Sequence, residues 1–203
     1  MKYFIKLFIL LILLQSCGKE NKTENETFDF NNLYRIKTVK QNVGTIDGVA
    51  CKDKIELEIQ FYEPLSGKKI ANQVKFYKNN KIDSLKSHFY NLKFKKIKAN
   101  RYIGDIELMH NKEKIIEIEF KAITSLSNKI KPLTFKSNNS NKIHFDFTNT
   151  NHEFPIKGVL CIKIDADTII KGEKIEGYVN RFMFVDNNEM TDNLYIKKYK
   201  RYF

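Results

Sequence analysis

Apolar and polar side chains alternate with a period of two along most of the chain beyond residue 32. The pattern is clearest in "KIELEIQFY", where Ile55, Leu57, Ile59 and Phe61 alternate with polar residues and Tyr62. Such alternation is typical of a β-strand with one buried and one solvated face. We therefore predict a strand here whose apolar face is buried.

Similar short runs recur along the chain, at 34–39, 70–77, 101–108, 115–123, 142–147, 156–164, 174–185 and 193–202. Stretches rich in Asn, Gly or Pro separate them, such as "EPLSGKK", "KNNK", "SNNSN" and "VDNNE". Many short strands without long intervening helices predict a mainly β protein, built as an antiparallel β-sandwich or an open barrel.

One segment, "KIDSLKSHFYNLKF" at 81–94, is compatible with two structures. A helix would place Ile82, Leu85, Phe89 and Leu92 on one face. A strand would instead place Tyr90, Leu92 and Phe94 at alternating positions on one face. We favour a turn or short helix followed by a strand.

The first 16 residues have the layout of an export signal. Lys2 and Lys6 supply positive charge, Phe8–Leu14 is an unbroken apolar run, and polar residues follow. A helix that spans a membrane needs about 20 apolar residues, and this run is much shorter. An uncleaved anchor is therefore the weaker interpretation. A plain signal peptide is the other alternative to the lipoprotein signal described next.

The residues Leu14, Gln15, Ser16 and Cys17 resemble the lipobox of bacterial lipoproteins. The resemblance implies that residues 1–16 are removed and that Cys17 becomes the first residue, carrying a diacylglycerol on its thiol and often a further acyl chain. Two or three acyl chains hold a protein on a membrane stably, whereas one does not. Because Gly18, not Asp, follows the cysteine, the resemblance favours the outer membrane, at its periplasmic face or at the cell surface.

Residues 17–32 are polar and predict a flexible tether to the membrane. Beyond it we expect a β-sandwich-like unit at 33–124, and at 130–203 either a second β-rich unit or a continuation of the same sandwich. "GVAC" at 48–51 returns as "GVLC" at 158–161, and "GKKIANQV" at 67–74 returns as "GEKIEGYV" at 172–179. This echo favours two related units, and coincidence among similar hairpins is the alternative.

The segment "FYEPLSGKKIANQVKFY" resembles the opening strand, turn and strand of transthyretin-like and immunoglobulin-like modules. The resemblance implies a sandwich and carries no function.

The chain has three cysteines. If Cys17 is lipidated, Cys51 and Cys161 remain as an even pair in an oxidising compartment, where a disulfide is expected more readily than in the cytosol. The alternative is that each is a small buried side chain on its own strand.

The chain is strongly basic, with a net charge of +12. Since Lys2 and Lys6 precede Cys17, the chain from Cys17 onward has 34 basic and 24 acidic residues, or +10. Basic and aromatic residues interleave in "YIKKYKRYF", which makes a candidate anion-contact tail of Lys197, Lys198, Tyr199, Lys200, Arg201 and Tyr202. For an exported protein the expected anions are an acidic glycan, lipid head groups or an envelope protein, and not nucleic acid. An amphipathic edge strand protected by lysines is the alternative.

Motifs for catalysis or metal binding are sparse. The histidines occur singly, at His88, His110, His144 and His152, outside any zinc spacing. Two acidic stretches, with Asp165 and Asp167 and with Asp186, Glu189 and Asp192, lack the twelve-residue calcium pattern and are interpreted as solvated turns. No metal or cofactor is expected.

Together these features predict a lipid-anchored envelope protein that acts as a non-catalytic binding or structural module. An envelope hydrolase, whose site would form only in the fold, is the first alternative. An immunity or inhibitor lipoprotein that binds a protein toxin by electrostatic steering is the second.

Overall fold

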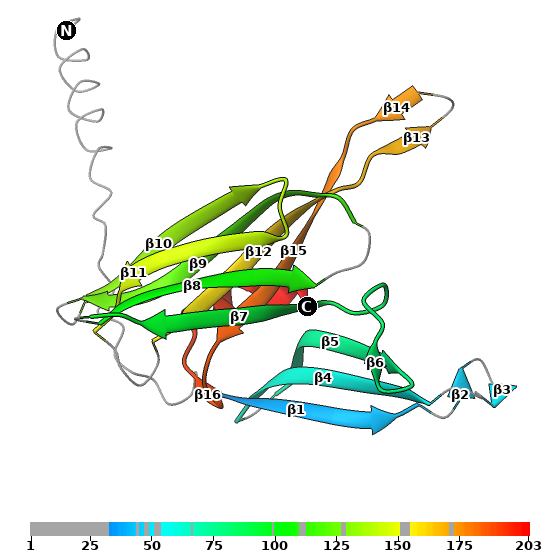
Figure 1. Ribbon diagram of the computed structural model, residues 1–203, viewed down its shortest axis with the longest axis horizontal. Helices are drawn as coiled ribbons and strands as arrows, with labels where there is room; N and C mark the ends of the chain where they lie inside the picture. Colours follow the sequence, from blue (N-terminus) through cyan, green and yellow to red (C-terminus); the bar gives the residue numbers. More distant parts are fainter. Residues whose placement is uncertain are drawn as a thin grey trace, which may run out of the picture. The chain divides into compact units, whose positions relative to one another are not determined.

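The computed structural model of the protein consists mainly of antiparallel β-sheets (Figure 1). It describes residues 33–43, 45–46, 49–50, 54–65, 67–98, 100–109, 113–126, 129–150, 155–170 and 173–203. The expected signal peptide and the expected tether at 17–32 lie outside these residues. The prediction of a mainly β, antiparallel fold is confirmed.

Two sheets, which we call sheets I and II, stack face to face. Sheet I has the order β11-β8-β7, and sheet II has the order β10-β9-β12-β15. The strands of sheet I are β7 (Phe89–Lys96), β8 (Arg101–Met109) and β11 (Lys142–Thr148). Those of sheet II are β9 (Ile115–Leu126), β10 (Lys129–Asn138), β12 (Lys157–Asp165) and β15 (Tyr178–Asp186).

The core between sheets I and II is built around aromatic rings. Phe120 on β9 and Phe145 on β11 are both fully buried, with ring centroids 5.6 Å apart. Phe135 and Phe147 pack beside them at 6.0 Å from each other. Aromatic side chains each remove 150–250 Å² from water, roughly, so this cluster dominates the apolar contacts of the sandwich.

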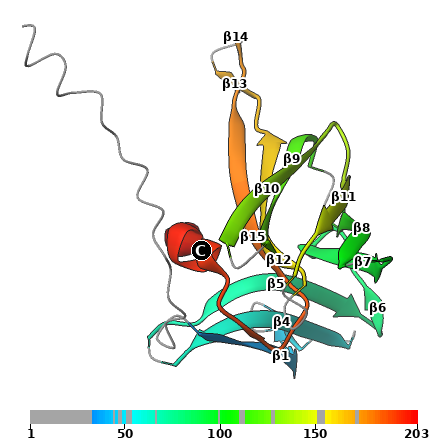
Figure 2. The same cartoon turned by 90° about the vertical axis from the view of Figure 1, so that its left-hand side faces the viewer.

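A third sheet, sheet III, has the order β16-β1-β4-β5-β6. Its strands are β1 (Tyr34–Asn42), β4 (Ile55–Pro64), β5 (Ile70–Lys78), β6 (Lys81–Ile82) and β16 (Met190–Thr191). It packs against the second face of sheet II (Figure 2). There the rings of Tyr62 and Phe184 meet edge-on, with centroids 5.3 Å apart. Sheet II is therefore the middle of three layers. On β15, Phe184 faces sheet III while its neighbours Met183 and Val185 belong to the core shared with sheet I.

The Asn72 side chain of sheet III bonds the backbone at the edge of sheet II. The register of β4 and β5 shifts near Asn72. Its amide donates to the carbonyl of Phe184 at 2.9 Å and accepts from the Phe184 backbone N–H at 2.7 Å. Because β15 is the last strand of sheet II, Asn72 satisfies backbone groups that no strand pairs there.

Strands from 33–124 and from 130–203 share sheets. In sheet II, β9 pairs with both β10 and β12, and in sheet I β8 pairs with β11. The two ranges therefore do not form separate sheets. Nor do the segments at 67–74 and 172–179 fold alike, because the first runs from a turn into β5 whereas the second forms β14 (Glu173–Ile175) and the start of β15.

Two short hairpins complete the strands. One pairs β2 (Thr45–Ile46) with β3 (Val49–Ala50), and the other pairs β13 (Thr168–Ile170) with β14. The single run predicted at 174–185 is thus two strands, β14 and β15, with an interruption at Glu176 and Gly177. The prediction of a turn followed by a strand at 81–94 is confirmed, since a turn at residues 84–86 precedes β7.

The prediction of a strand at 193–202 is wrong. This segment forms a helix, α2 (Leu194–Tyr199), followed by a 3₁₀ helix, η2 (Lys200–Tyr202). Asn193 caps α2, because its side chain accepts a hydrogen bond from the backbone N–H of Tyr195 at 3.1 Å. The buried residues Ile196 and Tyr199 are three positions apart, which suits one face of a helix.

The prediction for the two faces of β4 is also wrong. Glu56 and Tyr62 are the buried residues of this strand, whereas Ile55, Leu57, Ile59 and Phe61 are only half-buried. Glu56 is tolerated there because the Lys40 and Lys54 ammonium groups each lie 3.2 Å from its carboxylate.

Candidate functional site

The predicted anion-contact tail divides into an inner aromatic side and an outer basic side. Tyr199 and Tyr202 each pack on Phe182, with ring centroids 4.8 Å apart, and Phe203 stacks on Phe184 at 4.7 Å. The aromatic residues thus fix the tail to β15. This contact leaves the buried Tyr199 ring unable to stack on a ligand.

The basic side chains of the tail point outward. Lys197, Lys198, Lys200 and Arg201 are all exposed. The Lys198 ammonium lies 5.5 Å from the Tyr199 ring, and the Arg201 guanidinium lies 4.9 Å from the Tyr202 ring. Both contacts leave these positive charges accessible to solvent.

An open groove lies between the tail and the turn that connects β4 with β5. Its volume is about 650 Å³, which is within the range of small-ligand sites. We call it the basic groove. Its lining consists of Tyr34, Pro64, Gly67, Lys68, Lys69, Ile70, Ala71, Lys200, Arg201 and Phe203.

Gly67 lets the chain turn at the rim of the basic groove. Its φ is +107°, a left-handed conformation that other residues adopt only with strain. No atom lies within 4 Å of the position that a Cβ would take. Backbone conformation, not crowding, therefore requires glycine immediately before Lys68 and Lys69.

The groove carries an excess of positive charge. Lys69 pairs with Glu63 at 2.7 Å, and this hydrogen bond lowers the pKa of the Glu63 carboxyl. Among the residues that the structure describes, Lys68, Lys200 and Arg201 pair with no carboxylate. The arrangement can therefore receive an anion between cations from two distant parts of the sequence.

A half-buried carboxylate fixes the start of the tail. Asp186 accepts hydrogen bonds from the Tyr62 hydroxyl at 2.8 Å, the Thr191 hydroxyl at 2.5 Å and the Asn193 amide at 3.0 Å. Burial raises the pKa of Asp186 to about 7 even though these donors act in the opposite direction. Asp186 thus links sheet III, β15 and the residue that caps α2.

Three of the other acidic residues singled out in the sequence are engaged in ion pairs. Asp165 lies 2.8 Å from Lys114, which lowers its pKa to about 2, and Asp167 lies 2.7 Å from Lys174. Asp192 pairs with Lys157. In the described part of the chain, no group of three or more His, Cys, Asp and Glu residues could hold a metal ion.

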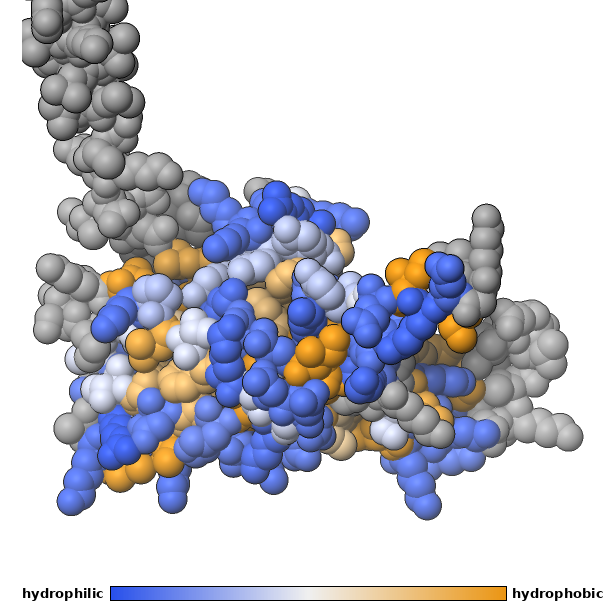
Figure 3. Space-filling model, turned by 90° about the horizontal axis from the view of Figure 1, so that it is seen from above, coloured by the Kyte–Doolittle hydropathy of each residue, from blue (hydrophilic) through white to orange (hydrophobic). Residues whose placement is uncertain are grey.

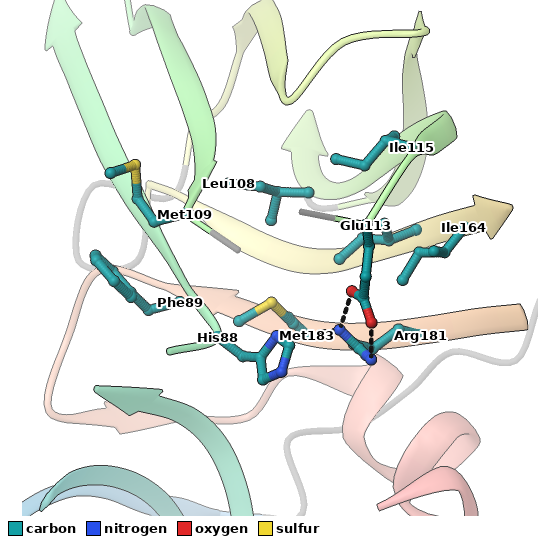
Figure 4. A pocket seen from close by; sticks show the side chains of 10 residues that line it. His88, Phe89, Leu108, Met109, Glu113, Ile115, Ile164, Arg181 and Met183 are labelled. Carbon is teal, nitrogen blue, oxygen red and sulfur yellow. Dashed lines mark hydrogen bonds and ion pairs between the residues drawn. The ribbon is translucent and has the colours of Figure 1, made fainter. Parts of the chain in front are cut away.

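A second cavity lies at one end of the core between sheets I and II (Figure 4). Its mouth holds Arg181, bonded to both carboxylate oxygens of Glu113 at 2.8 and 3.1 Å and to the His88 ring at 3.0 Å. The remaining volume is about 10 Å³, enough for one water molecule. We interpret this cavity as a closed end of the core.

The remaining predicted residues are dispersed. His144 lies on β11, 3.0 Å from Asp105, while His110 and His152 lie outside the described residues. Cys161 is half-buried on β12, and burial raises the pKa of its thiol. Cys17 and Cys51 lie outside the described residues, so lipidation and the disulfide stay predictions.

Sequence reasoning found Lys200 and Arg201 but missed Lys68, Lys69 and Tyr34. The stretch "SGKK" predicts a turn and not a binding site, and no local pattern connects it with the tail. A cluster of two lysines beside a glycine turn was the one available signal.

The structure thus defines an antiparallel β protein with a basic groove. No protein-family model matches the chain, and no curated protein or solved structure does so either. Across the residues that the structure describes, no helix is both long and apolar enough to cross a bilayer.

Proposed function

We propose that this protein is a lipid-anchored protein of the cell envelope that binds an anionic ligand in the basic groove without transforming it. The observation that carries the proposal is the convergence of Lys68, Lys200 and Arg201 on an open hollow of about 650 Å³.

The chemistry of the groove indicates the kind of ligand. A guanidinium can bond both oxygens of a carboxylate or phosphate, and lysine side chains add point charges. The walls formed by Tyr34, Ile70 and Phe203 offer apolar contact. A glycan or lipid head group bearing phosphate or carboxylate fits both features.

Attachment to the envelope is supported by the lipobox resemblance at Cys17. We expect the intact mass of the purified protein to correspond to a chain that begins at Cys17 and carries acyl groups. A Cys17→Ser variant should lack them. A mass matching the unmodified chain would contradict the attachment.

Ligand binding is tested with two defined probes, the carboxylated glycan alginate and inositol hexaphosphate. The Lys68→Gln/Arg201→Gln double variant should bind the preferred probe about tenfold or more weakly, because two charge-assisted contacts of the groove are lost. The binding of the wild-type protein should also weaken as salt increases.

A matched control separates the groove from the general positive charge. Lys93 and Lys95 are exposed on β7, so Lys93→Gln/Lys95→Gln makes the same charge change elsewhere. Equal loss of affinity in both double variants would show diffuse electrostatic attraction and would contradict the proposed site. Breakdown of either probe would favour the hydrolase alternative.

A further inference from the structure

The outer face of sheet III, turned away from sheet II, is apolar at its centre. In the strand register, Ile59 on β4 lies between Val39 on β1 and Val74 on β5, and Leu57 lies opposite Phe76. Directly paired residues of antiparallel strands share a face. We call this surface the apolar face, formed by Val39, Leu57, Ile59, Phe61, Val74 and Phe76.

No described segment covers the apolar face. Figures 1 and 2 show β1, β4 and β5 as the outermost layer on that side. Its members belong to neither buried core cluster; Val39 is 39% exposed and the other five are half-buried. By contrast, Figure 3 looks onto the opposite side of the molecule and shows hydrophilic residues interrupted by small hydrophobic areas.

The inner face of the same strands is polar over part of its length. There the Glu58 carboxylate accepts from the Lys75 ammonium at 2.8 Å and from the Tyr77 hydroxyl at 3.0 Å. Sheet III thus places ion pairs inward and aliphatic side chains outward. A contiguous apolar face on an antiparallel sheet is the usual mark of a surface that packs against something else.

The rim of the apolar face is basic. Lys37 lies opposite Phe61 in the register, and Arg35 lies two residues before it on the same face. A hollow of about 390 Å³ adjoins them at this end, and Leu65 at its edge is 75% exposed. The acidic group in its lining is Glu63, whose charge Lys69 already balances at 2.7 Å.

A second copy of the chain fits this surface poorly. Three strands of nine or ten residues cover roughly 400 Å², whereas a stable protein complex needs about 800 Å² from each partner. Two identical basic rims would also repel each other.

An anionic lipid surface suits both the charge and the chain path. Each Lys or Arg near anionic lipid strengthens binding about fivefold. Leu33, where the described chain begins, lines the hollow beside Arg35 and Lys37. The 16 residues before it, from Cys17 to residue 32, span at most about 55 Å when fully extended, so a lipidated Cys17 would keep Leu33, at this end of the apolar face, within that distance of the bilayer.

We propose that the apolar face docks on the surface of a lipid bilayer that contains anionic lipids. This inference rests on the lipid attachment in the proposed function. Attachment through acyl chains raises the effective concentration of the bilayer, so a small contact area suffices.

The chain has no tryptophan, so one introduced Trp reports on one position. The lipidated full-length Phe61→Trp variant is reconstituted into vesicles of phosphatidylglycerol and brominated phosphatidylcholine. We expect about twofold quenching of its fluorescence, because residues of an interfacial apolar face approach the acyl chains. The control is Phe94→Trp, since Phe94 lies on sheet I and is 39% exposed; its fluorescence should not change.

Adding Arg35→Gln and Lys37→Gln to the Phe61→Trp variant should reduce quenching in the phosphatidylglycerol vesicles toward its level in vesicles of phosphatidylcholine alone. The groove variant Lys68→Gln/Arg201→Gln should leave it unchanged. Equal quenching of the Phe61→Trp and Phe94→Trp variants would overturn the docking.

Flotation of the same vesicles reports attachment separately. Protein that floats without quenching of the Phe61→Trp variant overturns the docking and leaves the proposed function intact. Protein that does not float overturns the lipid attachment and, with it, this docking. A dimer in sedimentation together with unquenched fluorescence would assign the apolar face to a second copy instead.

Discussion

The core between sheets I and II and the layer formed by sheet III use alternating strands in different ways. In the first, Phe120 and Phe145 are fully buried and contact each other. In the second, Phe61 occupies an equally apolar alternating position and stays half-buried, while Glu56 on the other face is buried among lysines. Alternation therefore shows that a strand has two unlike faces, but neighbouring layers decide which face is covered.

The largest contrast is expected between two Phe→Ala substitutions. Phe120→Ala should lower the free energy of unfolding by about 3–5 kcal/mol, because it leaves a cavity in a closed core. Phe61→Ala should cost less than about 1 kcal/mol in solution, since this side chain is already in contact with water. Urea denaturation of both variants measures the difference; equal losses would mean that the apolar face is covered within the monomer.

The stability of the protein should depend on pH through Asp186, which lies at the junction between sheet III and sheet II. The pKa of Asp186 is raised to about 7 in the folded protein, while an unfolded Asp titrates near 3.9. The folded state therefore binds the proton more tightly between these values. Stability from this group is fully present below about pH 4 and declines as pH rises to about 7, by about 2–4 kcal/mol.

Asp186→Asn should remove this decline, which unfolding titrations between about pH 4 and 8 would detect. Asp146→Asn is a suitable control, because Asp146 is paired with Arg101 and its pKa is lowered. The control should leave the decline in place. A wild-type protein whose stability does not fall over this range would contradict the raised pKa of Asp186.

The smallest of the three effects concerns Asn72, one of the side chains that join the two regions. Asn72→Ala should destabilise the protein by about 1–3 kcal/mol, because it leaves the buried backbone N–H of Phe184 unsatisfied, while the carbonyl keeps a hydrogen bond from the Tyr90 hydroxyl at 3.0 Å. Asn91→Ala, on the exposed side of β7, should change stability by less than about 0.5 kcal/mol. Similar values for both variants would show that solvent or another group replaces the Asn72 contacts.

Local pattern predicted most strands but not all of them. β10 was missed because its sequence, "KIKPLTFKSN", contains Pro132 and little alternation. A proline is tolerated there because β10 is an edge strand, where one side of the backbone needs no partner. The tail was wrongly predicted as a strand, because its alternating pattern outweighed two helix signals, the Asn193 cap and the spacing of Ile196 and Tyr199.

The candidate site could be predicted only in part. Lys200 and Arg201 could be predicted because they belong to a short run of basic residues, "YIKKYKRYF", that is visible in the sequence. Lys68 joins them from more than 130 positions away. The packing of the tail aromatics on Phe182 and Phe184, together with the Asp186 hydrogen bonds, brings the two segments together.

The sequence by itself determined the class of fold, through strand alternation and turn residues, and it determined the positive charge of the protein. These properties are local or additive, so they need no knowledge of neighbours. The tertiary structure decided that the apolar side of β4 faces outward, that Asp186 is desolvated and that two basic segments border one groove. Each of these depends on which distant surfaces meet, because burial and charge proximity are properties of contacts and not of single segments.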